Sequence, residues 1–163
     1  LGSADMARQI EESLGEYGIK ETTTTEIIED MQSRLTQTHP EKTLIHPDTS
    51  HCIRVSTYFN EALWQVIVNA FDHTDCSECK IEITETTIGD NCIDGVRIAV
   101  IDNGPGISRH EYRPVFNGGE TNLEHASGLG LWFVKWTVEL VGGELHVTGT
   151  ADGTTVELIQ PQC

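Results

Sequence analysis

"VRIAVIDNGPGIS", residues 96–108, joins a short apolar strand to a run of turn-forming residues. A carboxylate such as Asp102 at the end of a buried strand is costly unless it is hydrogen-bonded, and an amino group on a flat ligand would be a suitable donor. Gly104 and Gly106 let the backbone approach such a ligand closely, and Ile107 can pack on its face. The same residue types dominate ordinary turns, so this stretch alone leaves a binding site and a plain turn equally open.

A second glycine-rich stretch, "SGLGLW" at residues 127–132, leads into an apolar helix. Helix N-termini with glycines present free N–H groups that can bind phosphates. The stretch is not a P-loop, because no Gly-Lys-Ser/Thr follows. It is not a dinucleotide-binding fingerprint either, because Phe133 occupies the third glycine position. It therefore indicates a phosphate site without identifying the class.

Asn69 stands in "FNEALWQVIVNAFDHT", residues 59–74, where apolar residues repeat at helical spacing. Asn is a mediocre helix former, and its amide oxygen suits Mg²⁺, which takes few protein ligands and keeps several waters. A surface or capping role is an equal alternative for this residue alone.

Hydrophobic periodicity divides the rest of the chain into helices and short strands. We expect helices over residues 5–18 and 26–38, with "ETTTT" between them and Thr25 capping the second, and a third helix closed by Gly142 and Gly143. Strands are expected at "KTLIHP", "HCIRVS", "CKIEITET", "VRIAVID", "ELHVTGT" and "TTVELIQ", the last two forming a hairpin that turns at Asp152–Gly153. This pattern predicts an α+β sandwich, with about three helices on one face of a mixed, mostly antiparallel sheet.

The charge balance narrows the possible partners. Asp and Glu outnumber Lys and Arg by 26 to 10 over 163 residues, which gives a net charge of −16. This argues against a nucleic-acid surface, which needs clustered basic side chains. So acidic a surface is tolerated best where salt screens it. We favour a halophilic protein, with an ordinary acidic cytosolic protein as the alternative. No stretch is apolar for long enough to span a membrane.

The five cysteines form no regular framework, and we expect reduced thiols in a cytoplasmic protein. His73, Cys76 and Cys79 stand at three-residue spacing, so zinc or a redox pair is an option, although a fourth zinc ligand would have to come from elsewhere. We favour the simpler interpretation, a helix end with incidental thiols.

Taken in order, the motifs resemble those of the Bergerat-fold (GHKL) ATPases, and in particular the catalytic and ATP-binding domain of sensor histidine kinases. "NAFDHT" resembles the family's N box, "DNGPGIS" its G1 box, "RPVF" its F box, "ASGLGLWFVKWTVELVGGEL" its G2 box with the following helix, and "GTTVELIQP" its closing strand. We therefore expect residues 22–163 to form the ATP-binding domain and residues 1–21 to be a linker or the tail of a removed dimerisation helix. "NAFDHTD" and "GETNLEHASGLGLW" are similar to haloarchaeal kinases.

The resemblance implies ATP and Mg²⁺ as cofactors and assigns roles to single residues. Asn69 would be the catalytic residue that binds Mg²⁺ at the phosphates. Asp102 would accept a hydrogen bond from the adenine amino group, partly through water. The remaining nucleotide-binding residues implied are His73 beside the base, Gly104, Gly106 and Ile107 at the adenine wall, Gly128, Leu129, Gly130 and Leu131 at the phosphates, and Thr154 on the adenine side. Residues 108–127 would form a lid.

Two residues depart from the family pattern. Asp72 occupies a position where many members carry a Lys that reaches the phosphates, so Mg²⁺, Arg113 or Lys135 would have to compensate. Gln65 stands where hydrolysing relatives carry a Glu that activates water, and an amide cannot take a proton. Glu61 lies about 12 Å along the helix from Asn69 and is a poor substitute. These departures favour phosphoryl transfer over stand-alone ATP hydrolysis.

The implied function is that of a protein-histidine kinase domain in two-component signalling. The ATP γ-phosphate would pass to a histidine on a separate dimerisation domain and then to the receiver domain of a response regulator. "HEYR", residues 110–113, falls inside the expected lid and is not expected to be the acceptor. A serine kinase of the anti-sigma-factor type and a catalytically silent nucleotide-binding module remain alternatives. We expect a cytoplasmic location, which includes the cytoplasmic part of a membrane-bound sensor, and neither nucleic-acid nor direct membrane contact.

Overall fold

The computed structural model describes residues 18–72, 78–102, 126–150 and 153–163. The helices are α2 (Thr24–Thr38), α3 (Phe59–Asp72) and α5 (Ala126–Glu139). The strands are β1 (Ile19–Thr23), β2 (Thr43–Ile45), β3 (Cys52–Ser56), β4 (Glu78–Ile88), β5 (Ile93–Asp102), β6 (Glu144–Thr150) and β7 (Gly153–Pro161). The expected helix over residues 5–18 and the expected lid over residues 108–127 lie almost wholly outside the described residues.

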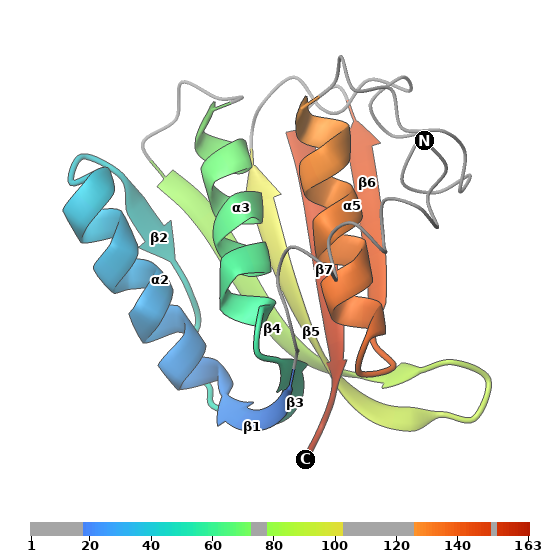
Figure 1. Cartoon of the computed structure of the whole chain (residues 1–163). Coiled ribbons are helices and arrows are strands. Elements are labelled where there is room, and N and C mark those ends of the chain that lie inside the picture. The colour runs from blue at the N-terminus through green and yellow to red at the C-terminus, as the bar shows by residue number, and fades with distance from the viewer. Residues whose placement is uncertain (1–17, 73–77, 103–125, 151–152) are drawn as a thin grey trace.

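Five strands form one sheet in the order β2-β4-β5-β7-β6, and the helices α2, α3 and α5 stand side by side over one of its faces (Figure 1). Only the short β2 runs parallel to its neighbour; the other pairs are antiparallel. This confirms the predicted α+β sandwich with a mostly antiparallel sheet and three covering helices. A separate two-stranded sheet, β1-β3, lies at the lower end in Figure 1.

The core lies between the helices and the sheet, and the two periodicities of the sequence produce it. In α3 the buried apolar residues recur every three or four positions, while in β5 alternate residues turn inward. The resulting core includes Leu63, Val66 and Ile67 of α3, Val96, Ile98 and Val100 of β5, Val134 and Val138 of α5, and Leu158 of β7. Packing against this core fixes the separation of α3 and α5.

A glycine pair and a buried glutamine fix the C-terminal end of α5. Gly142 adopts a φ of +83°, and the N–H of Gly143 donates to the Val138 carbonyl at 3.0 Å, as in a Schellman cap. A Cβ at Gly143 would come within 2.8 Å of Val138 O and closer still to Gln160 and Ile159. The Gln160 amide is fully buried on β7 and also donates to Val138 O, at 3.3 Å. The predicted closure of this helix by Gly142 and Gly143 is confirmed.

The start of α2 differs from the expectation. Its N-cap is Thr23, not Thr25, because Thr23 Oγ1 accepts from the Glu26 N–H at 3.2 Å and the Glu26 carboxylate accepts from the Thr23 N–H at 3.4 Å. This capping box stabilises the helix start at Thr24. The preceding residues form β1, antiparallel to β3, where we expected only an interruption. β1 includes residues 19–21, which precede the expected domain start at residue 22.

The expectation of unpaired cysteines is wrong for two of the five. Cys52 of β3 and Cys163 form a disulfide with their Cα atoms 5.4 Å apart. An isolated bridge between Ile53 and Gln162 and the hydrogen bond from the Cys163 N–H to the Cys52 carbonyl bring the two chain segments together. A sequence separation of 111 residues concealed this pairing.

Candidate functional site

Four elements meet at one end of the sandwich, the upper end in Figure 1. They are the C-terminal part of α3, the end of β5 at Asp102, the start of β7 at Gly153 and the start of α5 at Ala126. The motifs singled out in the sequence at Asn69, Asp102, Gly130 and Thr154 all lie on these elements. The fold thus gathers at one end residues that are spread over half of the chain.

Asp102 is half-buried at the last position of β5, directly opposite Thr154 in the register of β5 and β7. Its Oδ1 accepts a hydrogen bond from the Thr154 backbone N–H at 3.2 Å. Thr154 is itself buried, with 6% of its surface exposed. This hydrogen bond orients the Asp102 carboxylate. From the sequence we expected only that the carboxylate would have a hydrogen-bond donor, without knowing which one.

Cys79 of β4 lies near Asp102. From the sequence we grouped it with His73 and Cys76 instead. Its thiol is buried and lies 3.7 Å from the Ile101 carbonyl, to which it can donate. Burial, and to a smaller extent the negative charge of Asp102, raises the pKa of the Cys79 thiol to about 12. Cys79 therefore stays a neutral thiol near neutral pH, unlike a catalytic thiolate.

Asn69 and Gln65, one turn apart on α3, face Gly130 of α5. A Cβ at Gly130 would lie 3.5 Å from Gln65 Oε1 and 3.6 Å from Asn69 Nδ2, which are ordinary contact distances. The bare glycine thus keeps a space between the two helices open. The amide oxygens of Asn69 and Gln65 are of the hard type that Mg²⁺ prefers, so these residues fit a magnesium ion held mainly by phosphates.

That space is part of a hollow of about 310 Å³ lined by Glu61, Trp64, Gln65, Val68, Asn69 and Gly130. Asn69 and Gly130, which we expected at the phosphates, line it, whereas Asp102 and Thr154, which we expected on the adenine side, do not. Trp64 and Glu61 are lining residues that the motif spacing did not single out as binding residues. Glu61 accepts a hydrogen bond from Arg34 at 3.1 Å, which supports its dismissal as a catalytic base.

Of the other residues to which the resemblance assigns roles, some are described by the structure and some are not. Gly128 and Leu129 lie in the first turn of α5, whose leading N–H groups have no acceptor within the helix. Leu131 is buried in the core, so only its backbone is available to a ligand. His73, Gly104, Gly106 and Ile107 lie outside the described residues, as does Arg113.

The charges around the hollow can also be located. Asp72 is exposed at the last position of α3. Lys135, one of the cations expected to offset it, forms an ion pair with Glu139 at 2.8 Å. The described lining of the hollow offers the Gln65 and Asn69 amides and the Gly130 backbone to a phosphate, and its charged side chain is that of Glu61, with no Lys or Arg among the lining residues.

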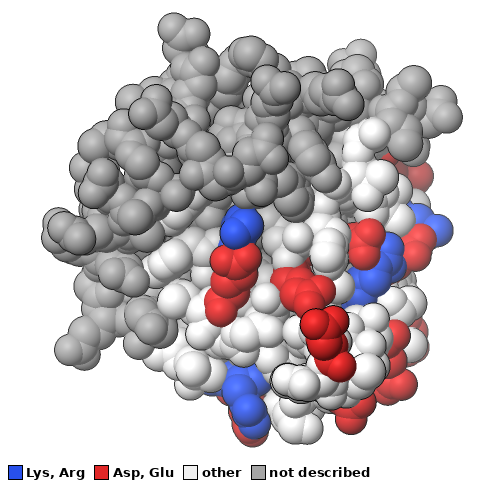
Figure 2. All heavy atoms as spheres, turned by 90° about the vertical axis from the view of Figure 1, so that its right-hand side faces the viewer, with Lys and Arg blue, Asp and Glu red and all other residues white. Residues whose placement is uncertain are grey.

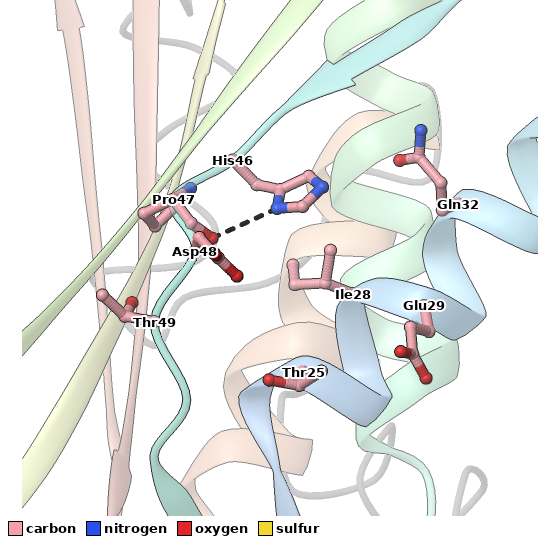
Figure 3. A pocket seen from close by; sticks show the side chains of 8 residues that line it. All are labelled: Thr25, Ile28, Glu29, Gln32, His46, Pro47, Asp48 and Thr49. Atoms are coloured by element: carbon pink, nitrogen blue, oxygen red, sulfur yellow. Dashed lines mark hydrogen bonds between the residues drawn. The ribbon is translucent and has the colours of Figure 1, made fainter.

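A second hollow, of about 200 Å³, lies between α2 and the segment after β2 (Figure 3). Four residues of α2 and residues 46–49 line it, and its charged lining residues are Glu29 and Asp48. The His46 Nδ1 lies 3.2 Å from the Pro47 carbonyl. None of Asn69, Asp102, Gly130 and Thr154 lines this hollow, so it is separate from the candidate site.

The metal or redox group considered at His73, Cys76 and Cys79, which we did not favour, stays untested, because only Cys79 is among the described residues. In the described ranges, the group of three or more possible ligands is Glu21, Cys52 and Cys163. Two of its members form the disulfide, at the end of the sandwich away from Asn69 (Figure 1). No helix of the described chain is long and apolar enough to cross a membrane.

Several solved structures have a similar fold. A mycobacterial sensor histidine kinase, MprB, superposes with a TM-score of 0.67 at 20% identity and covers 89% of this chain and 98% of its own. The ATP-binding domain of PrrB from Mycobacterium tuberculosis gives the same values. The histidine kinase AdeS of Acinetobacter baumannii matches with a TM-score of 0.67 at 15% identity over 98% of this chain and 75% of its own. At such identities these likenesses show the fold alone.

A comparison with curated protein sequences finds no match. A family model, described as histidine kinase-, DNA gyrase B-, and HSP90-like ATPase, matches residues 55–162. This range is more than half of the chain and contains α3, β4, β5, α5, β6 and β7, the elements that form the site and the main part of the sheet. The chain therefore belongs to the family of histidine kinase-, DNA gyrase B- and HSP90-like ATPases, a membership that implies ATP binding.

Proposed function

We propose that the chain is the ATP-binding catalytic domain of a two-component sensor histidine kinase. It would bind Mg·ATP and transfer the γ-phosphate to a histidine on a separate dimerisation domain, from which a response regulator would receive it. The observation that carries this proposal is the placement of Gly130 of α5 against Asn69 and Gln65 of α3, at the same end of the sandwich as Asp102.

The chemistry required of these residues is mainly positioning, as phosphoryl transfer generally demands. The Asp102 carboxylate, oriented by the Thr154 N–H, would hold the adenine, while the first turn of α5 and Asn69 would fix the phosphates. A bound Mg²⁺ would neutralise part of the phosphate charge. The acceptor histidine would bring its own nucleophilic nitrogen.

Two side chains favour transfer over hydrolysis. Gln65 reaches the hollow, but an amide cannot remove a proton from water. Glu61 also lines the hollow, but Arg34 holds its carboxylate at 3.1 Å. If neither Gln65 nor Glu61 activates water, an incoming histidine would compete well as the nucleophile.

A catalytically silent nucleotide-binding module is the second candidate, because of the charges at the site. Asp72 adds a negative charge at the end of α3, while Lys135 is engaged by Glu139. An anti-sigma-factor-type serine kinase is less favoured, since it would want the acid that Gln65 replaces.

Binding is tested first, by the rise in melting temperature that saturating Mg·ADP causes. A ligand that binds only the native state at 100 times its Kd adds about 2.7 kcal/mol of stability. Asp102→Asn should remove this rise, because an amide still accepts from the Thr154 N–H but also presents an unwanted donor to adenine. Asp94→Asn, at the exposed start of the same strand, is the matched control and should keep the rise. An unchanged rise in Asp102→Asn would contradict the assignment.

Transfer is tested on a form extended to include the acceptor domain, with ATP labelled at the γ-phosphate. Phosphate on histidine is lost in acid and kept in base, whereas phosphate on serine is kept in acid. Acid-labile label would support the histidine kinase. Acid-stable label would favour the serine kinase, and nucleotide binding without any label would favour the silent module.

We also propose that the domain works in a salt-rich cytoplasm. Figure 2 shows Lys and Arg side chains lying beside acidic ones on the face drawn, and Arg97 is held between Glu157 at 2.6 Å and Glu82 at 3.7 Å. With a net charge of −16, the acids left without such partners repel one another unless salt screens them.

A further inference from the structure

The disulfide between Cys52 and Cys163 lies at the surface, beside the small β1-β3 sheet (Figure 1). Both cysteines are exposed, so a small thiol can reach either sulfur atom. Exposed disulfides are reduced more readily than structural ones that resist the glutathione pool, and they include the bonds that serve regulation and catalysis. The exposure of this bond therefore raises the question of what happens when it opens.

Backbone contacts hold the two cysteines together independently of the bond. The Cys163 N–H donates to the Cys52 carbonyl at 3.1 Å, and the Gln162 N–H donates to the Asp94 carbonyl at 3.0 Å. Ile53, which is buried in the core, forms an isolated bridge with Gln162. Because none of these contacts involves a sulfur atom, we expect the two thiols to stay close together after reduction. Each then has a high effective concentration for the other, and the bond can form again.

Cys52 also lies at the junction between β1 and α2. In the register of β1 and β3 it pairs with Thr23, the N-cap of α2. The Thr24 N–H next to it donates to the His51 carbonyl at 2.9 Å. In the described chain, β1 pairs with β3 alone. The disulfide therefore ties the segment that follows β7 to the one strand on which β1 is held.

β1 and β3 differ in how much they depend on this bond. Ile53 and Val55 of β3 are buried in the core and should stay packed without it. None of the five residues of β1 is buried, and a side-chain contact that holds this strand on β3 is the one from Arg54 to Glu21 at 3.5 Å. Elements with little buried apolar surface open locally most easily. Opening the bond should thus loosen β1 and leave the five-stranded sheet intact.

We propose that Cys52 and Cys163 form a reversible redox site that reacts with low-molecular-weight thiols and their disulfides. The thiolate of a small thiol attacks one sulfur atom and forms a mixed disulfide, while the other cysteine leaves as a thiolate and takes up a proton. A second small thiol attacks the mixed disulfide. Two small thiols are then oxidised to one disulfide and both cysteines are reduced, and the reverse reaction closes the bond.

The state of this site sets how firmly β1, and with it the start of α2, is attached to the rest of the domain. The inference rests on β1, β3 and the segment after β7. It does not depend on whether the domain binds nucleotide or on which group, if any, it phosphorylates.

The test incubates the folded full chain, in high-KCl buffer without denaturant, with glutathione mixtures of increasing reducing strength. Iodoacetamide then labels the free thiols, and mass spectrometry of the peptides reports Cys52 and Cys163 separately. The control is the double variant Cys76→Ser and Cys92→Ser, which removes two thiols that could themselves exchange with the bond. The remaining cysteine, Cys79, is buried.

We expect millimolar reduced glutathione to make Cys52 and Cys163 open to labelling together, in the wild type and in the control alike. Oxidised glutathione added before the label should protect both again. In the reduced chain, amide hydrogen exchange in β1 should be at least about tenfold faster, with exchange at the buried residues of β5 unchanged.

Three results would overturn the proposal. The first is a bond that resists glutathione until urea unfolds the chain, because such a bond is a permanent structural one. The second is faster exchange throughout β5 on reduction, because the bond would then hold the whole fold and not β1. The third is a bond that opens in the wild type and stays closed in the control, because Cys76 or Cys92 and not a small thiol would then be the attacking group.

Discussion

Replacing Gly130 by Ala should make the folded chain more stable and its nucleotide binding weaker. A glycine inside a helix costs about 1 kcal/mol relative to alanine. The added methyl would lie 3.5 Å from Gln65 Oε1 and 3.6 Å from Asn69 Nδ2, without a clash. We therefore expect a stability gain of up to about 1 kcal/mol, which raises the melting temperature by about 2–4 °C in a chain of this size.

Binding should change in the opposite direction. The same methyl would stand in the hollow of about 310 Å³ between α3 and α5, where phosphate oxygens would have to approach Asn69 and the first turn of α5. Displacing the phosphates even slightly loses short, directional hydrogen bonds. We expect the Kd for Mg·ADP to rise at least about tenfold, which corresponds to about 1.4 kcal/mol.

The two effects are separated by melting without nucleotide and by calorimetric titration with Mg·ADP. Gly142→Ala is the matched control at the other end of α5. Gly142 has a φ of +83° and nothing within 4 Å of an added Cβ, so this change should cost about 1–2 kcal/mol of stability and leave the Kd unchanged. A wild-type Kd in Gly130→Ala would show that the hollow is not the phosphate site. A lower melting temperature in that variant would contradict the described packing of α3 against α5.

Four further predictions concern the cysteines and the net charge. Reducing the disulfide, or making Cys163→Ser, should lower the free energy of unfolding by up to about 4–5 kcal/mol, because the bond closes a loop across 111 residues; identical urea midpoints with and without reductant would argue against the bond. Iodoacetamide should label the exposed Cys92 in the folded chain and leave the buried Cys79 unlabelled. Because folding raises the pKa of Cys79 from 9.0 to about 12, the stability that this thiol contributes should be complete below pH 9 and lost as the pH rises towards 12. Cys79→Ala should flatten that part of the pH profile. Transfer from molar to millimolar KCl should unfold the chain if salt screens its charge of −16, whereas an unchanged melting temperature in dilute buffer would contradict the halophile interpretation.

The fold class was accessible from local patterns because its main elements are strongly periodic. The apolar repeat in Phe59–Asp72 and the buried run that ends at Asp102 predicted α3 and β5. The glycine pair at residues 142 and 143 predicted where α5 closes. β1 was missed because Ile19–Thr23 is rich in exposed polar residues, and only its pairing with β3 makes it a strand.

For the candidate site, too, some residues were predicted from the sequence and others became visible only in the structure. Sequence reasoning proposed Asn69, Asp102 and the glycines of "SGLGLW" as site residues, because their residue types allow such roles and because their order resembles the family's motifs. It did not identify Trp64 as a lining residue of the hollow or Cys79 as the neighbour of Asp102. Neither residue carries a local signal beyond being apolar or sulfur-containing.

The sequence by itself determined the described helices, the strands other than β1 and the chemistry available at each motif, because these depend on residues a few positions apart. Only the tertiary structure decided which motifs meet: Gly130 with Asn69 and Gln65, the Asp102 carboxylate with the Thr154 N–H, and Cys52 with Cys163. These contacts join residues far apart in the chain. They exist because antiparallel strand pairing sets the register of β5 and β7, and because burial of a shared core sets the distance between α3 and α5.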